Sequence, residues 1–133
     1  MTSSATMLYL LASIREHLAA HRLSTSLVSV SVGCDVVHGD HATVHLQTGD
    51  LAGLAAVLLV WAHTLAKVSV TAWRPPHGET VHLSLVGERR DSTRIVVFGG
   101  VPFSDTLFGD LQPEGQHGVP LTVLRSWTAG MAA

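Results

Sequence analysis

Histidine is the most prominent source of possible chemistry in this chain of 133 residues, which contains nine of them. His38, His41 and His45 lie close together, and imidazole nitrogens are common ligands of zinc, nickel and copper. The four-residue step from His41 to His45 suits a helix, but His45 falls in an alternating, strand-like segment, where both rings can still face one side. We therefore consider these three histidines candidate metal ligands, with Asp35 and Asp40 as the nearby carboxylates. The alternative is a set of solvent-exposed histidines.

A second candidate site pairs His45 with His82. Each lies at the centre of a similar Val/Leu triplet, Val44–Leu46 and Val81–Leu83, in one of two hairpin-like segments. If the two hairpins pair, the rings become neighbours and form a ligand-binding or pH-responsive pair. The alternative is two polar side chains that face water.

No pattern of nucleophilic catalysis stands out. The Gly-x-Ser-x-Gly motif and the Gly-x-x-x-x-Gly-Lys phosphate loop are both absent. Cys34 is followed by Asp35 and then by His38, but a Cys–His pair requires contact in space, and an ordinary buried thiol is the alternative. We assign no catalytic residue and expect no cofactor, which favours a non-enzymatic protein.

Composition limits the possible functions. Hydrophobic residues make up 47% and charged residues 14% of the chain, which predicts a well-packed domain. The net charge of −2 argues against nucleic-acid binding, which depends on a basic surface. The apolar run Leu51–Ala62 is too short for a membrane span of about 20 residues. With one cysteine no internal disulfide forms, so we expect a cytoplasmic protein without membrane attachment.

Hydrophobic periodicity predicts three helices and five strands. The first helix buries Met7, Leu11, Ile14 and Leu18, places Ser13, Glu16 and His17 toward solvent, and is capped by Ser3 or Ser4. The second helix begins after the cap Asp50 and runs to Ala66, and the third begins at Pro120. The predicted strands cover Leu27–Val32, Ala42–Gln47, Val68–Trp73, Thr80–Val86 and Thr93–Phe98.

These elements predict an α+β fold in the order α-β-β-α-β-β-β-α, with about five strands in a mostly antiparallel sheet and the helices on one face. We expect a single domain, 1–133, whose parts are a flexible tail (1–6), a first αββ unit (7–48), a second αβββ unit (49–100), an irregular segment (101–118) and a C-terminal helix (119–131). Similar triplets, such as Val30–Val32 and Val68–Val70, suggest an αββ duplication. The alternative is a chance likeness between two valine-rich hairpins.

Two surfaces are candidates for protein contact. The second helix is apolar over most of its circumference, and Val57, Val60 and Trp61 lie outside its main stripe. The outer sheet face is rich in Ser and Thr and has Trp73 at one end. We therefore expect a small non-enzymatic interaction or adaptor module that binds itself as a homodimer or binds another protein. The alternative is a histidine-based metal- or small-ligand-binding module.

Overall fold

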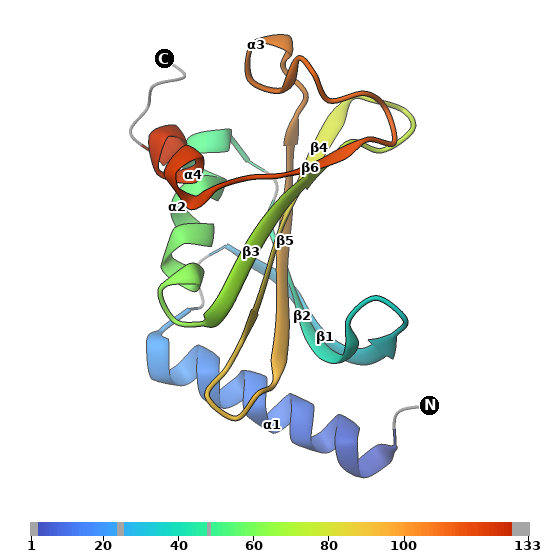
Figure 1. The fold of residues 1–133 in the computed structure, drawn as a ribbon. Helices are drawn as coiled ribbons and strands as arrows, with labels where there is room; N and C mark the ends of the chain where they lie inside the picture. Colours follow the sequence, from blue (N-terminus) through green and yellow to red (C-terminus); the bar gives the residue numbers. More distant parts are fainter. Residues whose placement is uncertain (1–2, 24–25, 48, 129–133) are drawn as a thin grey trace.

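The computed structural model describes residues 3–23, 26–47 and 49–128, which form one α+β unit (Figure 1). Its helices are α1 (Ser4–His21), α2 (Leu51–Ala62), the short α3 (Asp105–Phe108) and α4 (Leu121–Thr128). Its strands are β1 (Leu27–Asp35), β2 (Gly39–Leu46), β3 (Ala66–Trp73), β4 (Thr80–Glu88), β5 (Arg94–Pro102) and β6 (Gln116–Gly118). The predicted α+β class is confirmed.

The strands form a single six-stranded sheet in the order β1-β2-β5-β4-β3-β6. The sheet is mostly antiparallel, as predicted, but β2 and β5 are parallel. The parallel pair arises because α2 carries the chain away from β2, and β5 returns only after the β3–β4 hairpin. The strand count and order therefore differ in detail from the expectation.

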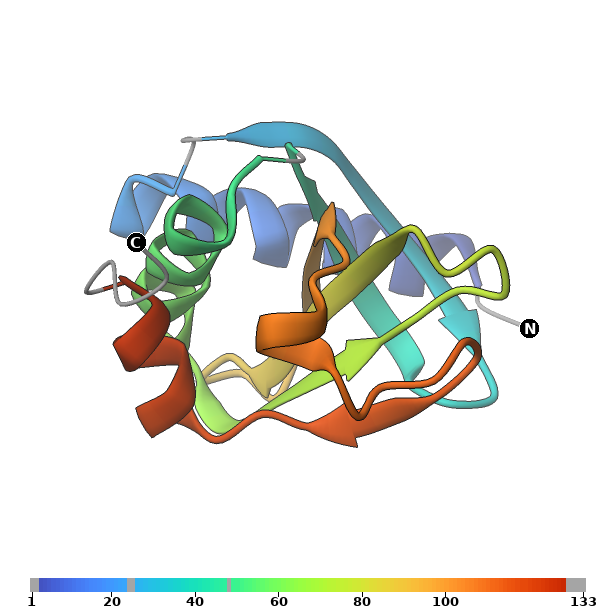
Figure 2. The same ribbon diagram turned by 90° about the horizontal axis from the view of Figure 1, so that it is seen from above.

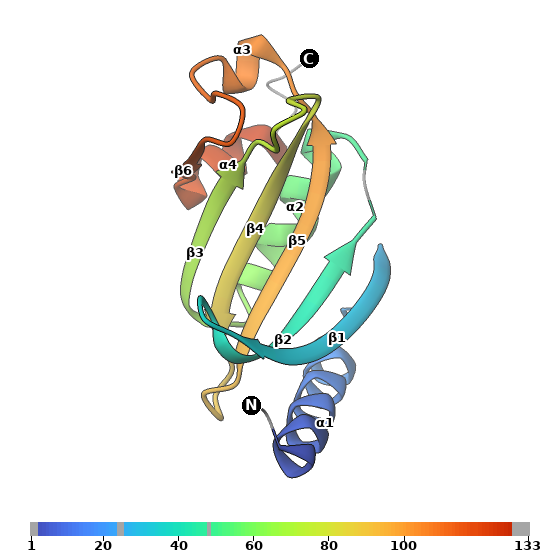
Figure 3. The ribbon, with the colours of Figure 1, turned by 90° about the vertical axis from the view of Figure 1, so that its right-hand side faces the viewer.

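One face of the sheet packs against the helices. Alternate side chains of the central strands, among them Val44, Leu83 and Val97, point toward this side and are fully buried. Figure 3 shows α2 behind β4 and β5, and Figure 2 shows from above that α2 and α4 lie together on one side, while α1 passes behind the strands. The opposite face carries no helix in the described part of the chain, so its outward side chains border solvent.

Helix α1 begins earlier and buries a different face than predicted. The Ser3 side chain accepts a hydrogen bond from the Thr6 backbone N–H, which confirms a predicted cap but starts the helix inside the expected tail of residues 1–6. Its buried residues are Leu10, Ser13, Ile14 and His17, whereas Leu11 is 44% exposed. The prediction that Ser13 and His17 face solvent was wrong. Both side chains are buried because Arg89, in the distant turn between β4 and β5, forms hydrogen bonds with them.

Helix α2 begins after the predicted cap, where the Asp50 carboxylate accepts a hydrogen bond from the Gly53 backbone N–H at 2.6 Å. It ends at Ala62, four residues before the predicted end, because β3 already begins at Ala66. The residues buried from α2 are Leu51, Leu54, Ala55, Leu58, Trp61 and Ala62. No helix in the described ranges is both long and apolar enough to cross a membrane.

The C-terminal third is more regular than expected. β5 continues through Gly99 and Gly100 to Pro102, although the two glycines were predicted to end it. A Cβ atom at Gly99 would lie 2.8 Å from Leu54 Cδ1, so the glycine lets α2 pack closely on the sheet. The segment 101–118, predicted to be irregular, contains α3 and β6. The last predicted helical residues, 129–131, lie outside the described part.

The predicted αββ unit corresponds to α1-β1-β2, and the predicted αβββ unit corresponds to α2-β3-β4-β5. Their hairpins do not pair directly, because β5 lies between β2 and β4. The duplication therefore stays a prediction.

Candidate functional site

The turn between β1 and β2 brings together part of the predicted metal site. The Asp35 Oδ2 atom lies 3.4 Å from His38 Nδ1 and 3.7 Å from His41 Nε2. His45 is not part of this cluster, because it lies four residues beyond His41 along β2, a distance of about 13 Å in an extended strand. The predicted set of His38, His41 and His45 is therefore replaced by Asp35, His38 and His41.

The backbone of the turn holds the Asp35 carboxylate in place. Its Oδ1 atom accepts hydrogen bonds from the backbone N–H groups of Val37, at 3.0 Å, and His38, at 2.6 Å. The bond from the His38 backbone is the main cause that lowers the pKa of Asp35, and the nearby imidazoles add to it. The carboxylate therefore stays charged at neutral pH, with Oδ2 turned toward both rings.

A row of rings crosses the helix-free face of the sheet and contains both histidines of the second candidate site. His45 stacks on Phe98, with ring centroids 4.6 Å apart and an angle of 4° between the planes. Phe98 lies 6.4 Å from His82, which in turn lies 5.6 Å from Trp73. Burial, followed by the nearby charge of His45, lowers the pKa of His82. The two histidines flank a common phenylalanine, and a ligand-binding role for them stays a prediction.

Sequence reasoning missed Phe98 as the link between these histidines. Its only signal was alternation along β5, which places Phe98 on the same face as Arg94 and Val96. Nothing local indicates that β5 inserts between β2 and β4 and pairs Phe98 with His45 on one side and Ser84 on the other.

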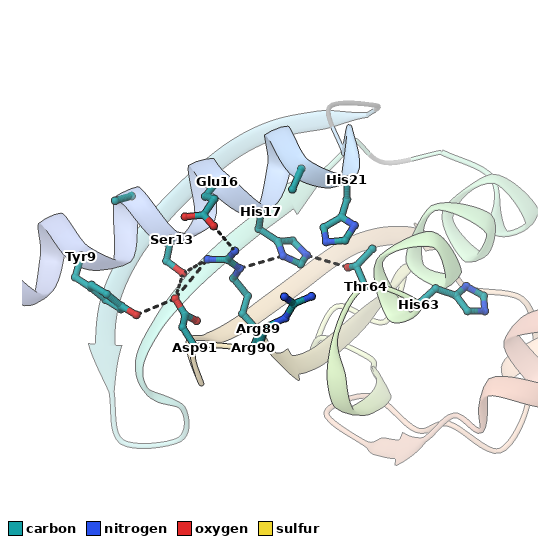
Figure 4. A pocket seen from close by; sticks show the side chains of 12 residues that line it. Tyr9, Ser13, Glu16, His17, His21, His63, Thr64, Arg89, Arg90 and Asp91 are labelled. Carbon is teal, nitrogen blue, oxygen red and sulfur yellow. Dashed lines mark hydrogen bonds and ion pairs between the residues drawn. The ribbon is translucent and has the colours of Figure 1, made fainter.

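A cleft lies between α1, the β4–β5 turn and the end of α2, with a volume of about 810 Å³ and several charged and polar side chains in its wall (Figure 4). Arg89 lies at its centre and is the main donor. Its Nη1 atom donates to Ser13 Oγ at 2.7 Å, and its Nε atom donates to His17 Nδ1 at 3.1 Å. Ion pairs at 3.4 Å join Arg89 to Glu16 and Asp91. The guanidinium therefore ties the β4–β5 turn to α1.

Asp91 is the second centre of this network. Its Oδ2 atom accepts hydrogen bonds from the Tyr9 hydroxyl at 2.8 Å and from Ser13 Oγ at 2.9 Å, while Oδ1 accepts from the Thr93 backbone N–H at 3.0 Å. Burial alone would raise the pKa of Asp91, but the bonds from Thr93, Tyr9 and Ser13 together lower it well below its usual range. Asp91 is therefore a charged anchor for α1.

His17 has a single allowed tautomer. Arg89 Nε only donates, so His17 Nδ1 must accept, and Nε2 carries the proton that it donates to Thr64 Oγ1 at 2.9 Å. The Thr64 hydroxyl donates in turn to the Trp61 carbonyl at 2.7 Å. Burial, then the charges of His21 and Arg89, lower the pKa of His17 to about 4. His17 is thus a neutral, structural histidine.

These contacts do not form a nucleophilic triad, although Ser13, His17 and Asp91 line one cleft. In a triad a histidine nitrogen takes the serine proton, but Arg89 and Thr64 occupy both nitrogens of His17. Cys34, the other nucleophile considered, is exposed on β1, so the alternative of a buried thiol was wrong. The cleft works as a structural clamp, and sequence reasoning missed it because its members are distant in the chain.

The four residues predicted as protein contacts differ in accessibility. Trp61 is 1% exposed and stacks on His17 at 5.7 Å, so the expectation that it lies on the surface is corrected. Val57 is half-buried, whereas Val60 is 53% and Trp73 39% exposed. Trp61 points inward because its spacing from Leu54 and Leu58 places it on the buried face of α2.

Comparison with known proteins gives no relative from which a function could be transferred. No family model matches the chain, and no significantly similar curated protein or solved structure was found.

Proposed function

We propose that this protein is a small non-enzymatic interaction module that acts as a homodimer, and that two copies pair through the free edge of β1. The observation that carries the proposal is this edge. β1 is nine residues long, ends the sheet and, among the strands of the described residues, pairs only with β2. Half of its backbone N–H and C=O groups therefore point away from the sheet and are available to another strand.

The sequence of β1 lacks the usual protection of an edge strand. Natural edge strands are blocked by lysine, proline, inward charges or bulges. β1 has no charged residue before Asp35 and no proline, and its only register shift lies at the start, between Leu27 and Ser29. Val28 is 58% exposed on this edge. Such a strand favours addition of a partner strand.

An apolar groove lies beside the same edge. It runs between α1 and β1 and is lined mostly by apolar side chains: Leu11, Ile14, Leu18, Ala19 and Val30, with Arg15 and Arg22 at its border. Leu8 and Leu11 on α1 are 67% and 44% exposed. A partner that added only a strand would leave this apolar groove exposed to solvent. A second copy of the chain would also contribute its own α1, which would cover the groove.

The alternating sequence of β1 suits pairing with itself. If two antiparallel copies meet around a two-fold axis at Val30, Val28 lies opposite Val32 and Ser29 lies opposite Ser31 of the other copy. Serines then meet serines on the outer side, and Val30 lies on the axis on the helix side, opposite its own copy. A second copy of this chain is therefore the occupant that we propose for the edge.

The oligomeric state tests the proposal directly. Size-exclusion chromatography with multi-angle light scattering should give twice the chain mass of 14.1 kDa at micromolar concentration. Val28→Lys adds a charge to the edge and should shift the protein to monomer, as should Leu11→Lys in the groove.

The matched control is Val60→Lys, since Val60 has nearly the same exposure on α2 and lies away from β1. It should stay dimeric. A wild-type monomer at high micromolar concentration would refute the homodimer. A dimer that Val60→Lys dissociates and Val28→Lys does not would place the interface on α2 and refute the role of β1.

A further inference from the structure

We infer that Asp35, His38 and His41 form a binding site for one divalent transition-metal ion of the zinc type at the tip of the β1–β2 hairpin. This inference does not depend on how two copies pair. One ligand atom from each residue, a carboxylate oxygen or an imidazole nitrogen, lies within 4.8 Å of the other two.

The hydrogen bonds around His41 leave it with a lone pair that faces the cluster. His41 Nδ1 lies 2.8 Å from the Gly39 carbonyl, which only accepts, so Nδ1 carries the ring hydrogen. In the neutral ring Nε2 then presents a lone pair to Asp35 Oδ2 at 3.7 Å. Two acceptors face each other at this distance, and a cation between them would satisfy both. A carbonyl partner on the far ring nitrogen is also the usual way in which a metal-binding histidine is oriented.

The turn itself holds the ligands in place. The backbone N–H groups of Val37 and His38 fix Oδ1 of Asp35. Oδ2 faces the rings, and an ion would replace its long hydrogen bond of 3.4 Å with His38 Nδ1. Arg94, on the neighbouring strand β5, donates from Nη1 to the His38 carbonyl at 3.2 Å and so holds the turn against the sheet. His41 is only 8% exposed, so its ring has little freedom to leave the site.

The distances fit a small ion with little movement. Zinc bonds of 2.0–2.2 Å in a tetrahedral site place neighbouring ligand atoms about 3.4 Å apart. His38 Nδ1 is already 3.4 Å from Asp35 Oδ2, His41 Nε2 is 3.7 Å from the same oxygen, and the two histidine nitrogens, within 4.8 Å of each other, need to approach by at most about 1.4 Å. Two imidazoles and one carboxylate suit zinc, nickel, cobalt or copper(II) and disfavour magnesium and calcium. A fourth position remains for water or another ligand, since the Asp35 and His38 side chains are 47% and 27% exposed.

Isothermal titration calorimetry with zinc chloride on untagged, metal-free protein tests the site. We expect one zinc ion per chain and no binding of magnesium under the same conditions. His41→Ala and His38→Ala should each weaken binding at least about tenfold. Asp35→Asn, which keeps an oxygen for the turn but removes the charge, should also weaken it. Cobalt should give the visible absorption of a tetrahedral complex, which is lost in the same variants.

The matched control is His45→Ala, since His45 lies on the same face of β2 but outside the cluster. It should bind zinc within twofold of the wild type. Thermal melting in EDTA must show that each variant is folded, and His38→Ala remains the informative variant if His41→Ala does not fold. No saturable zinc binding up to millimolar concentration would overturn the inference. So would equal weakening by His45→Ala and His38→Ala, or several weak sites that none of the variants affects.

Discussion

His17 shows how one residue couples stability to pH. Its pKa is lowered to about 4 in the folded protein, whereas a histidine in an unfolded chain titrates near 6.5. Between these values the unfolded state binds more protons, so its free energy falls relative to that of the folded state. The stability that neutral His17 contributes is therefore full above about pH 6.5 and is lost as the pH falls toward 4.

We predict a loss of about 2 kcal/mol from this group between pH 7 and pH 5. Urea unfolding of the wild type and of His17→Gln at both values measures it, because glutamine can keep both hydrogen bonds but does not titrate. The variant should lose less stability on acidification. His117→Gln, on an exposed histidine of β6, is the control and should follow the wild type. Equal pH dependence in wild type and His17→Gln would contradict the prediction.

The network around His17 also shows that hydrogen bonds between residues far apart in the chain could not be predicted from the sequence alone. Ser13 and Arg89 are 76 positions apart, and nothing in the local pattern pairs them. Periodicity placed Ser13 and His17 on the solvent side because it scores polarity, and it cannot detect that a distant arginine will satisfy both groups. The hairpin histidines were partly predictable, since Asp35, His38 and His41 are close in sequence and a turn brings them together.

At the scale of elements, helix caps and strand alternation were predictable because they depend on neighbouring residues. Ser3 and Asp50 cap the two long helices as expected. The face of α2 was harder to assign, because a helix that is apolar all round has no clear stripe. Tertiary packing against the sheet and α1 decides that Trp61 is buried and Val60 is exposed.

Because Trp61 is buried and Val60 is exposed, substitutions of these two α2 residues should change the stability of the protein by unequal amounts. Trp61→Ala should lower the free energy of unfolding by about 3–5 kcal/mol, because it empties a fully buried site next to His17. Val60→Ala should change it by no more than about 0.5 kcal/mol. Chemical denaturation of both variants measures the difference. Similar effects would mean that Trp61 does not pack in the core.

At the scale of the whole molecule, the class of the fold followed from the sequence but the strand order did not. Order depends on which strands meet across long stretches of chain, and the pairing of β2 with β5 joins Thr43 to Val96. Short-range patterns carry no signal for such a contact. For the same reason the row of rings on the open face could be predicted only as a conditional pair, His45 and His82, without the Phe98 ring that lies between them.

The proposed dimer makes a prediction about the molecule as a whole. If folding and association are linked, the melting temperature should rise with protein concentration, because association removes folded monomer from the unfolding equilibrium. Calorimetric or fluorescence melting curves across a hundredfold range of concentration would measure this. Val28→Lys should abolish the dependence, and a wild-type melting temperature that does not change with concentration would count against a dimer that stabilises the fold.

The position of β5 has a consequence for how the protein is made. Because β5 joins β2 to β4, the two hairpins synthesised earlier cannot share one sheet until residue 102 has left the ribosome. Until then β2 and β4 each have an unpaired edge, and both edges are completed by the same strand, β5. The nascent chain is therefore most exposed to mispairing during the synthesis of residues 81–102, before β5 closes the gap.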